Sequence, residues 1–495
     1  MKNPSLFIRT AYLALAAVLT GAPLSGAPAA RPAALPAALS LEDALTREVQ
    51  AARASARELG VHIVDLSSHA PAFGYAADEP RILASNTKLL TTAAALGILG
   101  GQFEFETRVM GRGTITGDRL VGDVAIVGDG DPNISGRFHD GDSYGVFRSW
   151  ARQLLGEGIR HVSGDLLMVD GIFQPPSVHP DWPRDQLSAW YEAPVEGLSF
   201  NDNCVLVRVT PGSRAGLPAH VETVPRLDYF EIRSTATTTG SRARSHLAIG
   251  RLADSETIVV SGAIYTGSGP SEEWVAVQNP AAYFAAGVRA AFAEEGVEID
   301  GGTFFVAAAL GSEWQLLASH RSGLARTLEV TNKRSQNFYA ESLAKYLGYS
   351  QRGEGSWSAG VGVVSEFLDR LGVAPESFHL VDGSGLSRGN VMSPRAMTQL
   401  LEKMYFHPLG REFVRSLPYS GEQGLHWQRR LARTPYAGNV FAKTGTIRGV
   451  STLSGYAKAA SGRVYAFSIL CNQVRSTAAA KAAQDRIVSA LIDRG

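Results

Sequence analysis

The segment ASNTKLLTTAAALGILG, residues 84–100, contains the pattern that decides the fold of this 495-residue chain. It is rich in alanine and leucine, its only charged residue is Lys88, and it ends among several glycines. A stretch that is apolar on all sides is typical of a helix buried in a protein core. The sequence therefore predicts a buried helix that begins near Ser85.

Strand-like segments lie on both sides of this helix, close to the two ends of the chain. VHIVDL (61–66) precedes it, and three more segments, NVFAKTGTI (439–447), VSTLSGYAKA (450–459) and VYAFSILC (464–471), come before a last helix. Helical patterns fill most of the chain between about 315 and 439. We predict an α+β domain in which strands from both chain ends complete one mixed sheet covered by helices.

The chain between residues 104 and 314 has a different pattern. Short alternating segments such as RLVGDVAIVG and TIVVSGAIYT are separated by Gly, Asp and Pro turns, which is typical of β-structure. Helix-like stretches near 144–157 and 280–296 interrupt them. We interpret 104–314 as a β-rich insertion of one or two domains, between a first part of the main domain at 40–103 and a second part at 315–495.

The N-terminus has the order of features found in secretory signals. Lys2 and Arg9 precede an apolar stretch at 11–24, and the small residues SGAPAA follow. This order predicts a signal peptide over 1–29 and a leader over 30–39, hence export to the periplasm. An uncleaved membrane anchor is the alternative, although the apolar stretch is short for one.

Composition excludes several classes of function. Lys+Arg and Asp+Glu both number 47, and no basic run occurs, which argues against nucleic-acid binding. Two cysteines cannot form a zinc cluster, and Asp129-x-Asp131-x-Asn133 lacks the glycine and glutamate of a calcium loop. We expect no metal and no cofactor. Cys204 and Cys471 lie in apolar runs and are expected to be buried thiols, with a disulfide left as the alternative.

Three short motifs occur in order along the chain. They are Ser85-x-x-Lys88, Ser335-x-Asn337 and Lys443-Thr444-Gly445, the motif set of serine enzymes that form acyl intermediates. A serine hydroxyl becomes a good nucleophile only when a base removes its proton. Ser85 and Lys88 are three residues apart on a helix and share a face, so Lys88 is the candidate base if burial and a second cation lower its pKa.

The other motif residues have chemical types that suit the rest of such a reaction. Ser335 is the candidate proton relay to the leaving amine, and Asn337 the candidate holder of the substrate amide and of Lys88. Lys443, with the hydroxyls of Thr444 and Thr446, fits a substrate carboxylate. The backbone N–H groups of Ser85 and Thr446 are the expected oxyanion hole, and Gly445 is expected to let the substrate approach the strand closely.

Each motif alone is weakly specific, because two of them occur twice. Ser342-x-x-Lys345 also fits the first motif, but it follows Ser335 directly on the same predicted helix. Ser199-x-Asn201 also fits the second, but it lies inside the β-rich insertion. The order and the predicted elements therefore favour Ser85 and Ser335. His62 and His426 are interpreted as structural or surface residues, since the chain has no G-x-S-x-G.

With these motifs, the chain resembles the penicillin-binding protein 4 family over roughly residues 40–490. The long insertion between the first two motifs is characteristic of that family, as are the local strings at 128–132, 198–203, 335–341, 382–387 and 442–451. The resemblance implies a penicillin-binding, β-lactamase-like domain with a central antiparallel sheet flanked by helices. One departure is the string Gly424-Leu425-His426-Trp427, where the family usually has Gly-Thr-Leu.

The resemblance also implies an activity and further site residues. It implies an exported D-alanyl-D-alanine carboxypeptidase and endopeptidase that acts on peptidoglycan peptides and is acylated by β-lactams. The family's catalytic positions fall on Ser85, Lys88, Ser335, Asn337 and Lys443, and its binding or supporting positions include Thr444, Thr446 and Ser384. Arg388 is a candidate for an acidic substrate group and Asp170 for an ammonium, with surface ion pairs as the alternative.

Two other functions remain open from the sequence. A β-lactamase of the same fold would need a base for fast deacylation, and no E-x-x-L-N string lies between the second and third motifs. A catalytically silent cell-wall-binding protein is the second alternative, against which the intact motif set argues. Trp190 and Tyr191 fit either ordinary packing or a pocket wall. Peripheral association with the membrane or a cell-wall complex is also left open.

Overall fold

The computed structural model describes residues 39–495. The expected signal peptide over 1–29 and residues 30–38 of the expected leader lie outside the described residues. The first described helix, α1 (Leu41–Ala52), is capped by Ser40, whose side chain accepts a hydrogen bond from the backbone N–H of Asp43. Within the described part of the chain, no helix combines the length and the apolar character needed to cross a membrane.

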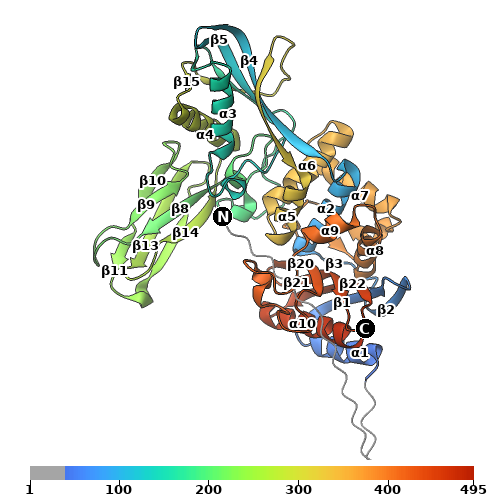
Figure 1. Ribbon diagram of the computed structural model, residues 1–495. Helices are drawn as coiled ribbons and strands as arrows, with labels where there is room; N and C mark the ends of the chain where they lie inside the picture. The colour runs from blue at the N-terminus through green and yellow to red at the C-terminus, as the bar shows by residue number, and fades with distance from the viewer. Residues whose placement is uncertain (1–38) are drawn as a thin grey trace, which may run out of the picture. The chain divides into compact units, whose positions relative to one another are not determined.

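One five-stranded sheet joins the two ends of the chain (Figure 1). Its strand order is β2-β1-β22-β21-β20, and the strands are β1 (Ala56–Asp65), β2 (Ala70–Tyr75), β20 (Val440–Ile447), β21 (Val450–Lys458) and β22 (Val464–Val474). The prediction that both chain ends supply the sheet is confirmed. The sheet is antiparallel throughout and not mixed, because hairpins connect all neighbours except β1 and β22.

Helices cover both faces of this sheet. On one face α1 and α10 (Thr477–Arg494) pack side by side, with Leu45, Val49 and Ile487 against the buried sheet residues. On the other face α8 packs directly, and its core continues into the remaining helices of the domain. Those helices are α2 (Thr87–Leu99), α5 (Leu324–Lys333), α6 (Asn337–Arg352), α7 (Trp357–Arg370), α8 (Pro394–Tyr405) and α9 (Gly410–Ser416).

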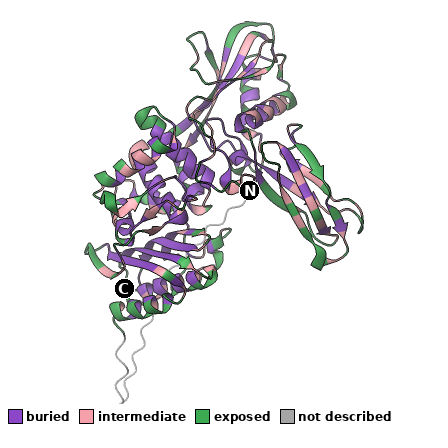
Figure 2. Ribbon diagram, turned by 180° about the vertical axis from the view of Figure 1, so that it is seen from behind, coloured by how far each residue is buried: buried purple, intermediate pink, exposed green. Residues whose placement is uncertain are grey.

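Helix α2 is the buried helix expected from residues 84–100. Ten consecutive positions from Thr87 to Leu96 are buried, and the inner helices are mostly buried in Figure 2. A single 3₁₀ turn, η1 (Ala84–Asn86), precedes the α-helix. Ser85 therefore lies in a tight turn at the helix start, with the hydroxyl only partly buried.

The inserted region contains a seven-stranded sheet with two helices, α3 (Gly145–Gly156) and α4 (Pro280–Glu295). Both helices fall where the sequence predicts them. The strands are β4 (Glu104–Thr116), β5 (Arg119–Val127), β6 (His161–Val162), β7 (Leu166–Val169), β15 (Glu298–Ile299), β16 (Thr303–Val306) and β17 (Gln315–Gly323). Within it, β5, β7 and β16 run parallel to one another, so this part combines β-strands with α-helical crossovers.

Two smaller sheets complete the inserted region. One contains β8 (Cys204–Thr210), β9 (His220–Val224) and β14 (Ser271–Ala276), and the other contains β10 (Glu231–Ser234), β11 (Thr237–Thr239), β12 (His246–Arg251) and β13 (Thr257–Tyr265). Cys204 and Cys471 are both buried and free, as expected.

The C-terminal end of the insertion differs from the expectation. Residues 315–323 form β17, which pairs antiparallel with β4 of the seven-stranded sheet. We therefore propose that the insertion ends at Gly323 and not at residue 314. The reason is physical: β17 has no apolar face of its own, since only Ala318 and Ser322 are buried in it, and the strand is held by its neighbour.

Candidate active site

Ser85 and Lys88 lie on the same face at the start of α2. The Lys88 Nζ atom is 3.2 Å from Ser85 Oγ, 2.7 Å from Asn337 Oδ1 and 2.8 Å from the backbone oxygen of Ser384. All three of its hydrogen-bond partners are neutral, and the side chain is fully buried. Lys88 thus reaches the candidate nucleophile from inside the protein.

Burial changes the acid–base behaviour of Lys88. Loss of solvation lowers its pKa to about 7, although the negative charges of Glu341 and Asp382 work in the opposite direction. An amine with a pKa near 7 is partly unprotonated at neutral pH and can accept a proton from a hydroxyl. Burial, one of the two conditions named in the sequence analysis for a lysine base, is therefore present at Lys88.

Ser335 and Asn337 lie where α5 gives way to α6. Ser335 has a left-handed backbone with φ 58°, which turns the chain so that Asn337 begins α6. The Asn337 side chain accepts from Lys88 through Oδ1 and donates through Nδ2 to the carbonyl oxygen of Tyr191 at 2.8 Å. One amide therefore links α2 with the loop of the inserted region that contains Tyr191.

Lys443 completes the group from the edge strand β20. Its Nζ atom donates to Ser335 Oγ at 2.8 Å and to the Thr444 backbone oxygen at 2.9 Å. The side chain is fully buried. Burial, and secondarily the charge of Lys88, holds the pKa of Lys443 well below its usual value. The structure thus brings Ser85, Lys88, Ser335, Asn337 and Lys443 together from three distant parts of the chain.

Gly445 lies closely packed against the turn that contains Ser85. A Cβ atom at this position would lie 2.2 Å from Thr452 Oγ1, 2.8 Å from the Leu83 oxygen and 2.9 Å from the Ser85 nitrogen. The glycine therefore makes room for the backbone of the Ser85 turn; that it also lets substrate approach the strand stays a prediction. Thr452 Oγ1 donates to the Leu83 oxygen at 2.8 Å from the neighbouring strand, so the turn is fixed against the sheet.

A cavity of about 520 Å³ opens in front of Ser85. Trp190 and Tyr191 line this cavity. Of the two interpretations left open by the sequence, the structure therefore favours the pocket wall over ordinary packing. The lining residues are Ser85, Pro183, Gln186, Trp190, Tyr191, Ser335, Asn337, Gly385, Leu386, Arg388, Thr446, Ile447 and Arg448. The wall therefore includes both the catalytic domain and the loop at 183–191 of the inserted region.

The remaining predicted binding residues separate into two groups. Thr446 and Arg388 line the cavity, and Arg388 Nη1 donates to the Arg448 backbone oxygen at 2.8 Å. Thr444 lies on the same strand as Thr446 but is not part of the lining. Ser384 is fully buried, and it supports Lys88 through its backbone carbonyl instead of facing substrate. Asp170 is not brought to this cavity, because it lines a different one.

Sequence reasoning missed the two buried carboxylates behind Lys88. Glu341 accepts from the backbone N–H groups of Ser384 at 2.7 Å and Gly383 at 2.8 Å, and from Trp357 Nε1 at 2.9 Å. Burial, and then the charge of Asp382, raises the pKa of Glu341 to about 7. The sequence did contain a signal for both acids. Glu341 and Asp382 lie in the strings at 335–341 and 382–387, which are characteristic of the family that the chain resembles.

Asp382 organises the loop that follows it. Its side chain accepts from the backbone N–H groups of Gly385 at 2.7 Å and Ser387 at 2.6 Å. Asn390 Nδ2 and Trp182 Nε1 also donate to it. The loop with the Ser384 carbonyl is thus held by two carboxylates, one on each side.

His426 is exposed, in agreement with its interpretation as a structural or surface residue, but its contact with the third motif was not predicted. It lies in the string that departs from the family pattern, and its Nε2 atom is 3.2 Å from Thr444 Oγ1. Burial and the charge of Lys443 lower the pKa of His426 to about 4. A neutral imidazole therefore contacts the threonine of the third motif.

The duplicate motifs occupy structural positions. Ser342 Oγ donates to the Phe338 backbone oxygen at 2.9 Å within α6. Lys345 donates to backbone oxygens of Gln174 and Pro176. Ser199 Oγ donates to the Glu196 oxygen inside the insertion. These contacts support the choice of Ser85 and Ser335 over the duplicates.

The fold and the site together define a serine enzyme of the penicillin-binding class, with a nucleophile turn at a helix start and a motif strand at the sheet edge. Residues 41–493 match the D-Ala-D-Ala carboxypeptidase 3 (S13) family, and the chain belongs to that family of serine-type D-alanyl-D-alanine carboxypeptidases.

Comparison with individual proteins agrees. The chain is 34% identical over 452 residues to a D-alanyl-D-alanine carboxypeptidase of Actinomadura sp. (strain R39), covering 88% of this chain and 81% of the relative. The crystal structure of penicillin binding protein 4 (dacB) from Haemophilus influenzae superposes with a TM-score of 0.78 at 24% identity, covering 90% and 97% of the two chains. The same protein complexed with a β-lactam superposes with a TM-score of 0.74 at 23% identity, covering 91% and 99%.

Proposed function

We propose that this carboxypeptidase cleaves the bond between the two D-alanines of peptidoglycan stem peptides through an ester on Ser85. The observation that carries the proposal is the contact between a partly exposed hydroxyl and a buried amine, Ser85 Oγ and Lys88 Nζ at 3.2 Å. A base within hydrogen-bond reach of a hydroxyl and with a pKa near the working pH is suited to remove its proton. The open cavity gives a peptide access to that hydroxyl.

The first half of the reaction forms the acyl-enzyme. Lys88 takes the hydroxyl proton while Ser85 Oγ attacks the carbonyl carbon of the penultimate D-alanine. The backbone N–H groups of Ser85 and Thr446 receive the developing oxyanion. The carbon–nitrogen bond then breaks, and the leaving D-alanine takes a proton through Ser335, whose hydroxyl is 2.8 Å from Lys443 Nζ.

The second half releases the product. Water attacks the Ser85 ester, the carbon–oxygen bond breaks, and the Ser85 hydroxyl regains a proton. Thr446, which lines the cavity, is proposed to bind the terminal carboxylate of the substrate, together with Lys443 and Thr444 of the same strand. Asn337 fixes the substrate amide while its Oδ1 holds Lys88. The same arrangement accommodates a D,D cross-link, so we propose endopeptidase activity as well.

β-Lactams are proposed to acylate the same serine, because they resemble the D-Ala-D-Ala terminus. A solved relative that carries a β-lactam supports this assignment. The expected signal peptide and the location of peptidoglycan support a periplasmic enzyme. Peripheral association with the membrane or with a cell-wall complex remains part of the proposal.

The test uses an N-acylated tripeptide that ends in D-Ala-D-Ala. The wild-type protein should release free D-alanine, and the Ser85→Ala variant should release none. Binding of the peptide without release by the wild type would favour the silent wall-binding alternative. Rapid, repeated hydrolysis of penicillin, without a lasting adduct, would favour the β-lactamase alternative.

A further inference from the structure

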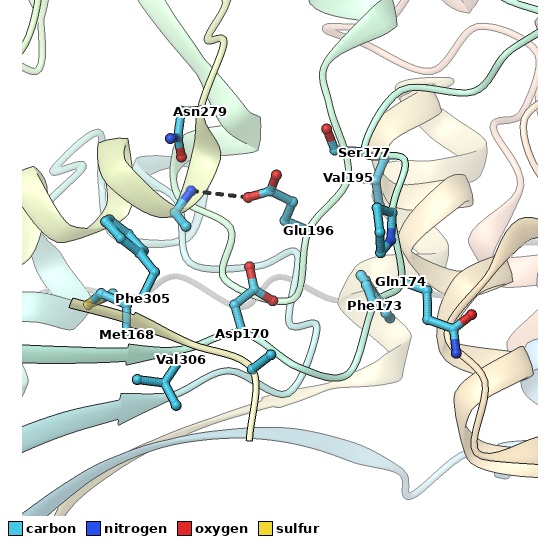
Figure 3. Close-up of a pocket in the computed structure, with 13 residues that line it drawn as sticks. Met168, Asp170, Phe173, Gln174, Ser177, Val195, Glu196, Asn279, Phe305 and Val306 are labelled. Carbon is cyan, nitrogen blue, oxygen red and sulfur yellow. Dashed lines mark hydrogen bonds between the residues drawn. The ribbon is translucent and has the colours of Figure 1, made fainter. Parts of the chain in front are cut away.

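One cavity of the inserted region is supplied with charge by the protein itself. It has a volume of about 500 Å³, and Asp170 and Glu196 lie on facing sides of it (Figure 3). The charge of the buried Lys345 side chain acts on both carboxylates and opposes the effect of burial on their pKa values. This cavity shares no lining residue with the Ser85 cavity, so it is separate from the reaction site.

A smaller cavity, of about 260 Å³, adjoins the reaction site. Trp190 lines both this cavity and that of Ser85. Gln336 lines it from its place between Ser335 and Asn337 of the second motif. The other lining residues, all from the inserted region, are Arg137, Asp202, Cys204 and Trp274. Independent small-molecule sites usually have volumes of about 300–1,000 Å³. This space, called the Trp274 cavity below, is therefore better suited to hold one part of a larger substrate.

The two charged residues of the Trp274 cavity form an ion pair. Arg137 donates to Asp202 Oδ2, and the Tyr339 hydroxyl donates to Asp202 Oδ1 at 3.0 Å. Burial disfavours the charge of Arg137, but the carboxylate of Asp202 raises the pKa of Arg137 above its usual value. The guanidinium is thus charged and is neutralised by its neighbour. Since the other four lining residues are uncharged, the cavity favours an uncharged polar ligand over a carboxylate or an ammonium.

The chain at Asp202 has an unusual backbone. Asn201, Asp202 and Asn203 are all left-handed, with φ of 52°, 60° and 51°. Asn and Asp tolerate this conformation better than most residues do, but a run of three stores strain. Asn203 fixes the turn, because its Nδ2 atom donates to the Pro194 oxygen at 2.9 Å. Strain of this kind is concentrated at functional sites, and here it places the carboxylate of Asp202 at the cavity wall.

Two tryptophans give the cavity its apolar surface. Trp274 lies on β14 and is 41% exposed, and Trp190 lies in the turn η3 (Trp190–Glu192). The backbone of Ala189 forms a bridge to Val275 of β14, so the two indoles come from neighbouring segments. A half-exposed indole gains free energy when it packs against an aliphatic stem or the flat face of an amide.

We propose that the Trp274 cavity binds the leaving strand of a D,D cross-link, the peptide whose side-chain amine departs when Ser85 attacks. The inference rests on the proposed function and deepens its endopeptidase part. Ser335 gives the proton to the leaving amine in that mechanism, and Gln336 continues the wall from Ser335 into the cavity. A single D-alanine ends before the cavity. A second stem peptide continues past Gln336 onto the indoles, where its amides meet the guanidinium of Arg137.

Rates of cleavage of two substrates test the proposal. One is the N-acylated tripeptide that ends in D-Ala-D-Ala. The other is a dimer in which the side-chain amine of one stem peptide is joined to the terminal D-alanine of another. Trp274→Ala should lower kcat/KM for the dimer by about tenfold, mainly through KM, and leave release of D-alanine from the tripeptide unchanged. Trp274→Phe should retain most of the dimer rate. Equal losses on both substrates, or no loss on either, would overturn the proposal.

Two further variants locate the effect. Phe304→Ala is the matched control, because Phe304 is an exposed aromatic residue of the same inserted region and lines neither cavity. It should cleave both substrates as the wild type does. Arg137→Lys keeps a cation beside Asp202 but loses the planar fork of donors, so we expect the dimer rate alone to fall by about threefold or more. Thermal unfolding checks that each variant is folded.

Binding to the Ser85→Ala protein separates failure of this inference from failure of the proposed function. We expect calorimetry to show that the dimer binds about tenfold more tightly than the tripeptide, and that adding Trp274→Ala removes this difference. Release of D-alanine by the wild type, together with equal affinity for the two peptides, would overturn the subsite and leave the proposed function intact. No release of D-alanine from the tripeptide would overturn both.

A sugar ring is the other ligand of peptidoglycan that stacks on indole rings. A tetramer of N-acetylglucosamine, which carries no peptide, should neither bind to the Ser85→Ala protein nor inhibit cleavage of the dimer. Saturable binding of the tetramer that Trp274→Ala abolishes would assign the cavity to the glycan and overturn the proposal of a leaving-strand site.

Discussion

Lys88 Nζ donates to the backbone oxygen of Ser384 at 2.8 Å, and the backbone N–H of the same Ser384 donates to Glu341 Oε1 at 2.7 Å. The base of the site is thus positioned by a peptide unit that a buried carboxylate fixes from behind. Glu341 does not line the Ser85 cavity. Its effect on the reaction passes through the Ser384 peptide and through its charge.

Replacement of Glu341 by glutamine should alter the pH dependence of acylation. The negative charge of Glu341 raises the pKa of Lys88, so a neutral amide lets that pKa fall further. We expect the midpoint of the acylation rate against pH to move to lower pH, with a slower maximal rate because the Ser384 loop loses an acceptor. Glu354→Gln, at an exposed site near the end of α6, is the control. An unchanged midpoint in Glu341→Gln would show that the carboxylate is only structural.

The wild-type rate of acylation by fluorescent penicillin should fall as the pH falls below about 7. Burial lowers the pKa of Lys88 from 10.5 to about 7, so the amine is mostly neutral above that pH and mostly protonated below it. Each further unit of acidity should slow acylation by about tenfold. Circular dichroism at each pH checks the fold. A rate that is flat from pH 5 to 8, or that rises only near 10.5, would contradict a lysine base at Ser85.

Gly445→Ala should damage both stability and acylation. The added methyl group would meet Thr452 Oγ1, the Leu83 oxygen and the Ser85 nitrogen, and such overpacking typically costs about 1–3 kcal/mol. Gly323→Ala is the matched control, because its Cβ would meet nothing within 4 Å and its φ is −76°. Urea unfolding and penicillin labelling measure the two effects. Full labelling of a stable Gly445→Ala protein would refute the close packing of β20 on the Ser85 turn.

His426→Ala should weaken substrate binding more than it slows the chemical step. The imidazole contacts Thr444 Oγ1 at 3.2 Å and stays neutral above about pH 4. Loss of one neutral hydrogen bond corresponds to about 2- to 10-fold in binding. We therefore expect a higher KM for the D-Ala-D-Ala peptide at similar kcat. Gln428→Ala, in the same turn, is the control. Equal effects of His426→Ala and Gln428→Ala on KM would contradict a specific contribution of His426 to substrate binding.

The main sheet and the buried helix could be predicted from the sequence because their patterns are strong. Residues 84–100 contain only one charged side chain, and VYAFSILC alternates little because both faces of its sheet are covered by helices. β17 was not predicted as part of the insertion. Most of its side chains are partly or fully exposed, so its place depends on pairing with β4, which the local sequence does not encode.

In the site, too, the residues of the motifs could be predicted from the sequence, and the residues placed by tertiary contacts could not. The five motif residues were found because the chemistry fixes their types and order. Glu341 and Asp382 were missed as parts of the site because their partners are backbone N–H groups, which any sequence provides. Asp170 lines a cavity other than that of Ser85, which could not be predicted because an isolated acid in a sequence does not indicate which cavity it will line. Gly445 was predicted as a site residue from its motif, but its close packing against the Ser85 turn depends on tertiary structure that the motif does not show.

Mass spectrometry of the penicillin adduct tests the central claim most directly. We expect one penicilloyl group on the peptide that contains Ser85 in the wild type and in Ser342→Ala, the duplicate-motif control, and no adduct in Ser85→Ala. An adduct on the peptide that contains Ser342, or unchanged labelling of Ser85→Ala, would contradict the assignment of Ser85 as the nucleophile.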